Sequence, residues 1–109
     1  CSNMIYLASP YSGTPEQQQL RFELAEACAA RLIRKKFVVF SPIVYAHNMA
    51  KQYTLPKTAE YWQDFNTEFL RHASDMYVLT LDGWDTSKGV EQETQLAKLL
   101  NIPITFTER

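Results

Sequence analysis

The sequence predicts one α/β domain in which a short parallel sheet lies between layers of helices. Four runs have the length of strands and are mostly apolar: residues 4–8, 37–40, 76–81 and 102–106. Continuous apolar runs are typical of strands that are buried on both faces of a parallel sheet. Amphipathic helical patterns separate them, and this alternation predicts a flavodoxin- or Rossmann-like three-layer sandwich. Ligands in such sheets bind beyond the carboxyl ends of the strands.

The first helix is expected over residues 15–35. Thr14 suits an N-cap, Pro15 suits a first helical position, and Lys35 carries the charge that favours a helix C-terminus. The next stretch, residues 43–55, is mixed in character, so we expect a loop that contains a short helical piece.

Two further helices follow. One is expected to open at Pro56, to present Trp62 and other aromatic residues to the sheet, and to end at Ser74. The last is expected after Gly89 and ends near Asn101, which suits a helix stop. Each is followed by an apolar run, as the alternating pattern requires.

Composition limits the class of protein. With 109 residues and 46% hydrophobic content, the chain suits one globular domain, which we assign to residues 4–109. Met4 resembles a native start, so residues 1–3 are expected to be an addition. The net charge of -1 gives no basic field, which disfavours a nucleic-acid polymer as a partner.

The cysteines and the hydropathy pattern indicate a cytoplasmic protein. Cys1 and Cys28 are the only cysteines, and they form no metal or redox spacing, so a reducing compartment is expected. The sequence shows no signal peptide and no apolar run of membrane-spanning length, so we expect no association with a membrane.

The functional prediction depends on residues 83–93, which read Gly-Trp-Asp-Thr-Ser-Lys-Gly-Val-Glu-Gln-Glu. This stretch follows the third apolar run and opens the last helix, so unpaired backbone N–H groups at the helix start can bind an anion or a sugar. Thr86 and Ser87 can cap the helix or bind a ligand. Gly89 would let a ligand approach the backbone closely.

The same helix carries two glutamates that helical geometry separates. At about 100° per residue, Glu93 falls near the middle of the apolar arc and Glu91 falls nearly opposite. Glu91 is therefore expected at the surface, where a first-turn acid favours the helix dipole. Glu93 points to the interior, which is costly unless its carboxylate is paired or used. A structural acid that caps or forms a salt bridge would have the same spacing, so both interpretations stay open.

The loops at the strand ends are rich in hydroxyls and acids and contain almost no basic residue. Their candidate side chains are Ser9, Tyr11, Ser12, Ser41, Tyr45, His47, Asp82, Asp85, Thr86 and Ser87. This set suits a sugar or nucleoside better than a polyphosphate. There is no phosphate-binding loop or dinucleotide fingerprint, and the histidines lack zinc-site spacing, so we expect no cofactor and no metal ion.

Several of the candidates admit two interpretations. Tyr6, in the first strand, is more commonly a core residue than a site residue. His47 can touch a ligand or lie on a surface loop. Asp64 and Asn66 lie in the helix before the third strand, where acids are usually solvated. Asp82 belongs to a turn signal, but it also follows the third strand, where ligands bind.

Two blocks of the sequence resemble the nucleoside 2-deoxyribosyltransferases. The first is Met4-Ile5-Tyr6-Leu7-Ala8-Ser9-Pro10-Tyr11, and the second runs from Phe69 through Asp75 to Glu93. The resemblance is strongest to an uncharacterised bacterial branch, the DUF1937 group. That branch shares the Ala-Ser-Pro-Tyr-Ser opening, the Phe-Ser-Pro-Ile motif and the Gly-Trp-x-x-Ser-x-Gly-Val-x-x-Glu loop. The resemblance spans essentially the whole chain from Met4, and the loop is its most specific part.

The resemblance implies roles for particular residues. Glu93 would be the nucleophile that attacks the anomeric carbon and expels the base, leaving a covalent glycosyl–enzyme. Ser87 and Gly89 would hold the 5′ side of the sugar, as in the related nucleoside 5′-monophosphate glycosidases. Asp82 or Asp64 would be the acid that handles the base or a hydroxyl. The remaining residues expected at the substrate are Tyr6, Ser9, Pro10, Tyr11, Ser12 and Asn66.

Three departures from the family pattern bear on the ligand. Ser9 replaces a glycine of the first turn, and Tyr11-Ser12 stand where the monophosphate glycosidases place a phosphate-binding arginine. Both concern recognition of a 5′-phosphate. The helical aspartate of the family aligns with Asn66, and Asp64 lies two residues earlier and faces another direction. This concerns the residue that handles the base.

We therefore expect an enzyme that cleaves or transfers the N-glycosidic bond of a nucleoside or nucleoside 5′-monophosphate through a glutamate nucleophile. One alternative is a glycosidase that cleaves the nicotinamide–ribose bond of NAD, as TIR-like domains do. Another is a non-catalytic nucleotide-binding module, which needs the pocket but no nucleophile. In each case the partner is a small molecule.

A homo-oligomer with its site near a subunit boundary is also expected. The chain contains six Tyr, six Phe and two Trp, and several of them fall between residues 53 and 69. One side of a helix cannot bury them all, so Tyr61 or Trp62 is expected to pack on a second copy. The resembled enzymes are also oligomers whose neighbouring subunits help to close the site. The alternative is that residues 43–55 fold back over these aromatic side chains.

Overall fold

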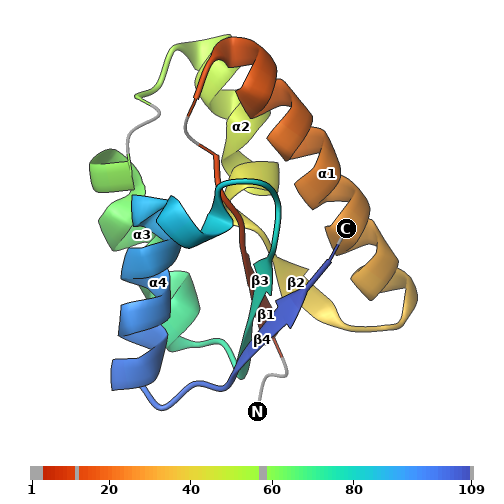
Figure 1. Cartoon of the computed structure of the whole chain (residues 1–109), viewed down its shortest axis with the longest axis vertical. Helices are drawn as coiled ribbons and strands as arrows, with labels where there is room; N and C mark the ends of the chain where they lie inside the picture. The colour runs from red at the N-terminus through yellow and green to blue at the C-terminus, as the bar shows by residue number, and fades with distance from the viewer. Residues whose placement is uncertain (1–3, 12, 57–58, 109) are drawn as a thin grey trace.

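The computed structural model describes residues 4–11, 13–56 and 59–108. The described residues form a three-layer α/β sandwich, which confirms the predicted fold class (Figure 1). The elements in chain order are β1 (Met4–Ala8), α1 (Pro15–Arg34), β2 (Val38–Phe40), α2 (Pro42–Tyr53), α3 (Ala59–Arg71), β3 (Asp75–Leu79), the 3-10 turn η1 (Trp84–Thr86), α4 (Lys88–Leu99) and β4 (Ile104–Thr107).

The sheet is parallel throughout, with the order β2-β1-β3-β4. The chain moves from β1 to β2 on one side and then crosses back to β3 on the other. The carboxyl ends of β1 and β3 therefore border the point at which the strand order reverses, where open α/β sheets bind their ligands. Figure 1 shows α1 on one side of the sheet and α3 with α4 on the other.

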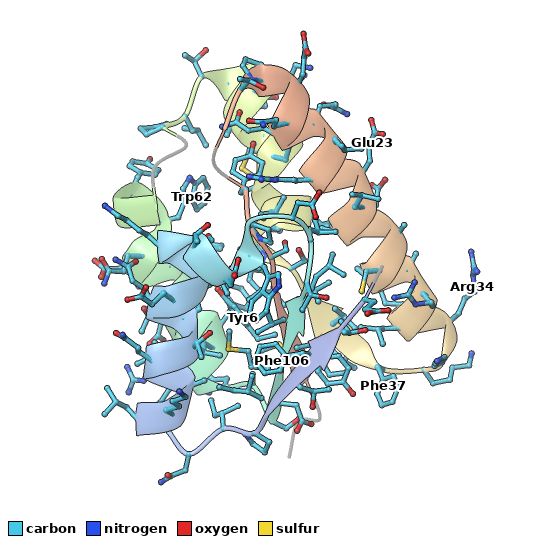
Figure 2. All side chains as sticks on the ribbon, viewed as in Figure 1. Tyr6, Glu23, Arg34, Phe37, Trp62 and Phe106 are labelled. Atoms are coloured by element: carbon cyan, nitrogen blue, oxygen red, sulfur yellow. The ribbon has the colours of Figure 1, made fainter. Side chains whose placement is uncertain are left out.

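Side chains of β1 alternate between two apolar clusters. Leu7 packs with α1 residues such as Ala25 and Leu32 on one face of the sheet. Tyr6 and Ala8 pack on the opposite face with residues of α3, β3 and α4. Tyr6 is fully buried and lies near the middle of the molecule (Figure 2). The predicted continuous burial of this strand is thus confirmed.

Polar caps fix where the helices begin. The Thr14 hydroxyl accepts a hydrogen bond from the Gln17 N–H, and the Gln17 side chain accepts one from the Thr14 N–H. This reciprocal capping box starts α1 directly beyond the β1 end. Ser87 caps α4 by accepting from the Val90 N–H at 3.4 Å. The cap fixes Ser87 as the residue from which α4 begins.

The expectation of a loop with a short helical piece over residues 43–55 was wrong, because α2 is a continuous helix. Its start carries two strong signals: the Ser41 hydroxyl accepts from the Val44 N–H, and Pro42 occupies the first turn. The helix ends at Tyr53, and its C-cap residue Thr54 adopts a left-handed conformation with φ 55°. This helix supplies one wall of the cavity described below.

Other predicted boundaries shift by a few residues. Helix α3 ends at Arg71 rather than at Ser74, and β3 begins at Asp75. Asn101, the predicted helix stop, has a φ of 58° just beyond α4, as such a stop requires. Among the described residues, no helix is long and apolar enough to cross a membrane.

Candidate active site

A cavity of about 900 Å³ opens beyond the carboxyl ends of β1 and β3. Small-molecule sites commonly have volumes of about 300–1,000 Å³, so a ligand of nucleotide size fits this space. The walls come from the β1–α1 connection, α2, α3 and the first turns of α4. Helix α2 contributes Ile43, Ala46, His47 and Ala50, whose spacing puts them on one helical face.

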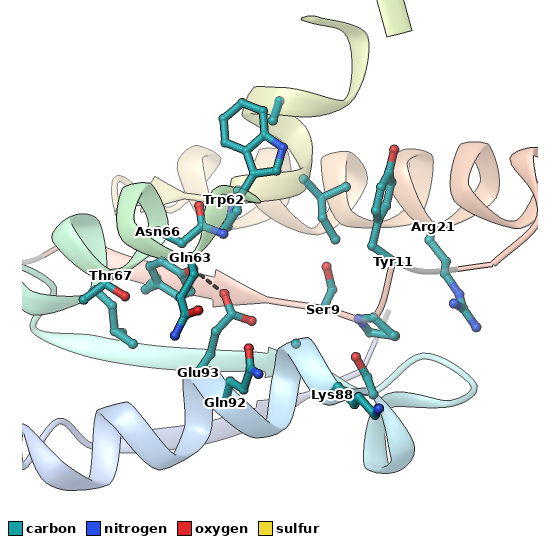
Figure 3. A pocket seen from close by; sticks show the side chains of 18 of the residues that line it. Ser9, Tyr11, Arg21, Trp62, Gln63, Asn66, Thr67, Lys88, Gln92 and Glu93 are labelled. Carbon is teal, nitrogen blue, oxygen red and sulfur yellow. Dashed lines mark hydrogen bonds between the residues drawn. The ribbon is translucent and has the colours of Figure 1, made fainter. Parts of the chain in front are cut away.

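Glu93 points from α4 into this cavity, opposite Gln63 and Asn66 of α3 (Figure 3). Val90 and Ala97, on the same side of α4, are buried against the sheet, whereas Glu91 is exposed. The helical-phase prediction for the two glutamates is therefore confirmed. The buried Tyr6 hydroxyl donates a hydrogen bond to Glu93 Oε2, so a core tyrosine of β1 fixes the carboxylate.

Burial changes the acidity of this pair. Desolvation raises the pKa of Glu93 to about 7, and the hydrogen bond from Tyr6 acts in the opposite direction. Burial, together with the charge of Glu93, raises the pKa of Tyr6, so this tyrosine stays protonated and donates. A carboxyl group that titrates near neutral pH in a cavity is a candidate nucleophile or acid–base group.

Two polar atoms of the cavity lack a protein partner. Ser9 Oγ and Asn66 Oδ1 are buried and form no hydrogen bond with any residue in the described part of the chain. Ser9 is only 8% exposed. Buried polar atoms in proteins are normally satisfied, so these two atoms are positioned to bind polar groups of a ligand. Ser9 follows β1 and Asn66 lies on α3, so they approach the cavity from different sides.

The start of α4 forms another part of the wall, with Ser87, Lys88 and Gly89. Ser87 serves as the helix cap, one of the two roles expected for it. A side-chain carbon added at Gly89 would meet only Ser87 Oγ, at 3.9 Å, so the backbone here faces open space. A ligand can therefore approach the Gly89 backbone closely, as the sequence suggested.

Sequence reasoning missed Arg21, which lines the cavity together with Lys88. Arg21 Nη2 donates to the Asp82 backbone oxygen at 3.0 Å, which holds the guanidinium beside the β3–η1 connection. Arg21 belongs to no motif, because it lies in the second turn of α1. The signal was its position on a helix whose start faces the strand ends. With it, the cavity has more basic character than its loops alone indicated.

The two candidate acids lie in different places. Asp64 of α3 lines the cavity. Asp82 does not: it lines a separate, smaller hollow with residues of α1 such as Leu20 and Leu24. Among the other predicted residues, Pro10 and Tyr11 line the cavity, and Ser12 lies outside the described residues.

His47 is a buried helical residue, not a residue of a surface loop. It is 4% exposed, and its ring stacks on Phe22 of α1 with 4.4 Å between ring centroids. Its Nδ1 lies 2.6 Å from the Tyr11 hydroxyl. The i, i+3, i+4, i+7 spacing from Ile43 to Ala50 was the signal that could have revealed this face of α2. Among the described residues, no group of His, Cys, Asp or Glu is arranged to hold a metal ion.

Comparison with known proteins gives a family without an assigned activity. No curated protein matches the chain. A family model described as a domain of unknown function (DUF1937) matches residues 3–108, which is nearly the whole sequence. The match includes the β1–α1 connection, α2, α3 and the start of α4, and therefore every wall of the cavity. The chain thus belongs to the DUF1937 family.

Proposed function

We propose that this chain cleaves or transfers the N-glycosidic bond of a nucleoside 5′-monophosphate or nucleoside, with Glu93 as the nucleophile. The observation that carries the proposal is the Glu93 carboxylate, held by the buried Tyr6 hydroxyl inside a cavity of about 900 Å³. The resemblance of the Ser87 to Glu93 segment to the nucleoside 2-deoxyribosyltransferases supports the same assignment.

The mechanism follows from the two oxygens of Glu93. Tyr6 holds Oε2, and Oε1 attacks the anomeric carbon as the bond to the base nitrogen breaks. The bonding electrons leave with the base, which takes a proton from an acid. Asp64 is the candidate, because it is an acid among the residues that line the cavity. Water or a second base then attacks the anomeric carbon and gives its proton to the Asp64 carboxylate, while the bond from that carbon to Glu93 Oε1 breaks and restores the carboxylate.

Positive charge in the transition state compensates for the raised pKa of Glu93. An oxocarbenium-like sugar beside the carboxylate favours its ionised form, so attraction to the carboxylate strengthens as the reaction proceeds. The neutral Tyr6 hydroxyl donates to the same carboxylate and lowers its pKa relative to burial alone.

The lining of the cavity favours a nucleotide over a smaller ligand. Apolar residues on α2 and α3, such as Ile43, Ala46 and Trp62, suit the flat face of a base. The unpaired Ser9 Oγ and Asn66 Oδ1 suit the hydroxyls of a sugar. Arg21, Lys88 and the backbone N–H groups at the start of α4 suit a 5′-phosphate.

The direct test is release of free base from a panel of nucleosides, their 5′-monophosphates and NAD. We expect Glu93→Gln to lower the rate by at least about a thousand-fold, since a nucleophile is removed. Glu91→Gln is the matched control, because Glu91 is exposed on the same helix. Near-normal rates in Glu93→Gln would overturn the mechanism. Release of nicotinamide alone would favour the NAD-cleaving alternative, and binding without any release would favour a non-catalytic module.

The phosphate end has its own test. Arg21→Gln should raise KM for the 5′-monophosphate about tenfold and leave KM for the nucleoside unchanged, because a charged hydrogen bond contributes about 1.5–3 kcal/mol. Arg34→Gln is the control, since Arg34 is exposed in the last turn of the same helix. Equal effects on nucleoside and monophosphate would argue that Arg21 supports only the fold.

A further inference from the structure

A chain of hydrogen bonds runs from the surface of α1 to the cavity wall. Gln19 Nε2 lies 2.9 Å from Glu23 Oε2, and Gln19 Oε1 lies 3.0 Å from His47 Nε2. His47 Nδ1 then lies 2.6 Å from the Tyr11 hydroxyl. Glu23 stands on the outer side of α1 in Figure 2, whereas Tyr11 lines the cavity (Figure 3).

The direction of every bond in this chain is determined by its ends. The Glu23 carboxylate only accepts, so the Gln19 amide turns its NH2 group to Glu23 and its oxygen to His47. An amide oxygen only accepts, so His47 Nε2 carries a hydrogen. A buried imidazole is neutral at least cost and then has one donor and one acceptor. His47 Nδ1 therefore accepts from Tyr11.

This direction fixes what Tyr11 offers to a ligand. The single hydroxyl hydrogen of Tyr11 is donated to His47, so only lone pairs of its oxygen remain for the cavity. The ring of His47 cannot swing freely, because it is stacked on Phe22. Tyr11 is thus a hydrogen-bond acceptor of fixed orientation, and its ligand partner must be an N–H or O–H group.

We propose that Tyr11 selects a nucleotide whose base carries an exocyclic amino group over one with a carbonyl at that place. This rests on the proposed function for the class of ligand. An ionised phosphate only accepts, so it is not the partner of Tyr11, and a sugar hydroxyl both donates and accepts, so it is not discriminated. Figure 3 shows the Tyr11 hydroxyl and Trp62 on the side of the pocket away from Lys88, which is the side left for the base.

The ligand test compares the dissociation constants of adenosine and inosine 5′-monophosphates, and of cytidine and uridine 5′-monophosphates, by calorimetry with the Glu93→Gln protein. We expect each amino nucleotide to bind about tenfold more tightly than its oxo counterpart. In each pair, the ratio of the dissociation constant of the oxo nucleotide to that of the amino nucleotide should fall to about one in Tyr11→Phe, because only the amino nucleotides bind more weakly. Tyr53→Phe, on an exposed ring of α2 outside the cavity, should leave both ratios unchanged.

A second pair of variants changes the hydrogen bonds from Glu23 to Tyr11 at residues that do not line the cavity. Gln19→Leu removes the acceptor of His47 Nε2, and both ratios should fall toward one. The exchange Gln19→Glu with Glu23→Gln keeps the net charge and places a carboxylate directly on Nε2, which favours an imidazolium. Nδ1 would then donate to Tyr11, the Tyr11 hydrogen would turn to the cavity, and oxo bases should become the preferred ligands.

The histidine itself gives a readout that needs no ligand. Nitrogen-15 NMR of the imidazole should show the Nε2–H tautomer for His47, with His72 as the other histidine of the chain. A Nδ1–H tautomer, or ratios unaffected by Tyr11→Phe, would overturn the proposal, as would equal weakening of all four nucleotides. Failure of all four to bind would reject nucleotides and this selectivity together, whereas binding without base release contradicts only the catalytic function.

Discussion

Glu93 is an acid in surroundings that disfavour its charge, and Tyr6 offsets part of that cost. The carboxylate is desolvated and receives a hydrogen bond from a hydroxyl that is itself fully buried. Such pairs are costly as structural features and useful as reactive ones. The free energy of unfolding and the reaction rate should therefore both depend on the protonation of this one group.

The free energy of unfolding should depend on pH through the protonation of Glu93. Its pKa rises from 4.5 unfolded to about 7 folded, so the native state holds the proton more tightly between those values. Stability contributed by this group is complete below about pH 4.5 and is lost as the pH rises to 7 and above, by about 3 kcal/mol at most. Glu93→Gln removes this loss and should be more stable than wild type at pH 8.5, with the difference vanishing near pH 4.5. Urea unfolding at several pH values measures it. A difference independent of pH would contradict the assignment.

Tyr6→Phe should separate the hydrogen bond from the packing. The ring stays in the core, but Glu93 loses its donor, so its pKa rises further above 7. The acid limb of the profile of kcat/KM against pH should move about one unit higher, and the rate at pH 7 should fall about fivefold, because the ionised fraction of Glu93 at that pH falls from about one half to about one tenth. Tyr77→Phe is the control, because Tyr77 packs on the opposite face of the sheet. An unshifted limb would show that Tyr6 does not tune the carboxyl.

The sequence was sufficient to predict the positions of some of these site residues and not of others. The position of Glu93 follows from helical phase, because α4 is regular from its Ser87 cap onward. Arg21 and the buried role of His47 were missed, because each depends on how one helix packs against another. No local pattern states that α1 and α2 meet at the mouth of the cavity. The polarity of Tyr11 depends on side chains from two helices and was equally out of reach.

At the scale of elements, the start of α4 combines a structural cap with an open backbone. Ser87 caps the first turn, and Gly89 in that turn has no neighbour closer than Ser87 Oγ, 3.9 Å from where a side-chain carbon would lie. The prediction of a loop over residues 43–55 failed at the same scale, since Ser41 and Pro42, which cap and begin α2, were not recognised as a helix start. Cap chemistry identifies helix starts more reliably than composition does in a mixed segment.

Gly89→Ala should leave the fold intact while it weakens binding. The added carbon meets only Ser87 Oγ at an ordinary distance, and alanine is the better helix former, so the melting temperature should stay level or rise slightly. The methyl group would occupy space near the ligand, and the dissociation constant should increase about tenfold or more. Gly83→Ala gives the contrasting case, because Gly83 has a φ of 89° and should lose stability instead. Unchanged affinity in Gly89→Ala would place the ligand elsewhere in the cavity.

At the scale of the whole molecule, an aromatic cluster remains partly open. Tyr45 stacks on Phe65 with 5.5 Å between centroids, so α2 does fold back over part of α3. Tyr45 and Tyr61 nevertheless remain 50% and 53% exposed. The alternative in which residues 43–55 fold back is therefore present in part, and the packing of a second copy on this region stays a prediction. We propose that a second copy covers the remaining surface near the cavity mouth.

Sedimentation at micromolar concentration tests this assembly. We expect a species at least twice the 12.6 kDa of one chain, because exposed aromatic side chains are enriched at interfaces. Tyr61→Glu should convert it to the smaller species and lower the rate of base release. Arg71→Glu, an exposed change on the same helix, serves as the control. A 12.6 kDa species with full activity would exclude a shared site.

The fold class as a whole was readable because each strand is a short apolar run between helices. The order of the strands could not be predicted from the sequence. Strand β1 pairs with both β2 and β3, and this order places the cavity at their carboxyl ends. Strand order depends on which helix crosses which face, a non-local property that periodicity does not encode. The sequence predicted that the site lies at the strand ends, but it did not predict the volume of the cavity or the basic residues on one side of it.

Tyr6 belongs to the core and also holds the proposed nucleophile, and this double role limits how position 6 can vary. Cavity residues that keep exposed surface, such as Gln63 and Gln92, can be exchanged with little effect on the packing of the sheet. Position 6 has no such freedom, since its ring packs beside Phe40 while its hydroxyl reaches Glu93. Laboratory evolution for a new ligand should therefore accumulate changes along α2 and α3 and leave this tyrosine untouched. Selection for heat resistance alone should be the condition that replaces Tyr6, because it favours an interior with fewer buried polar groups.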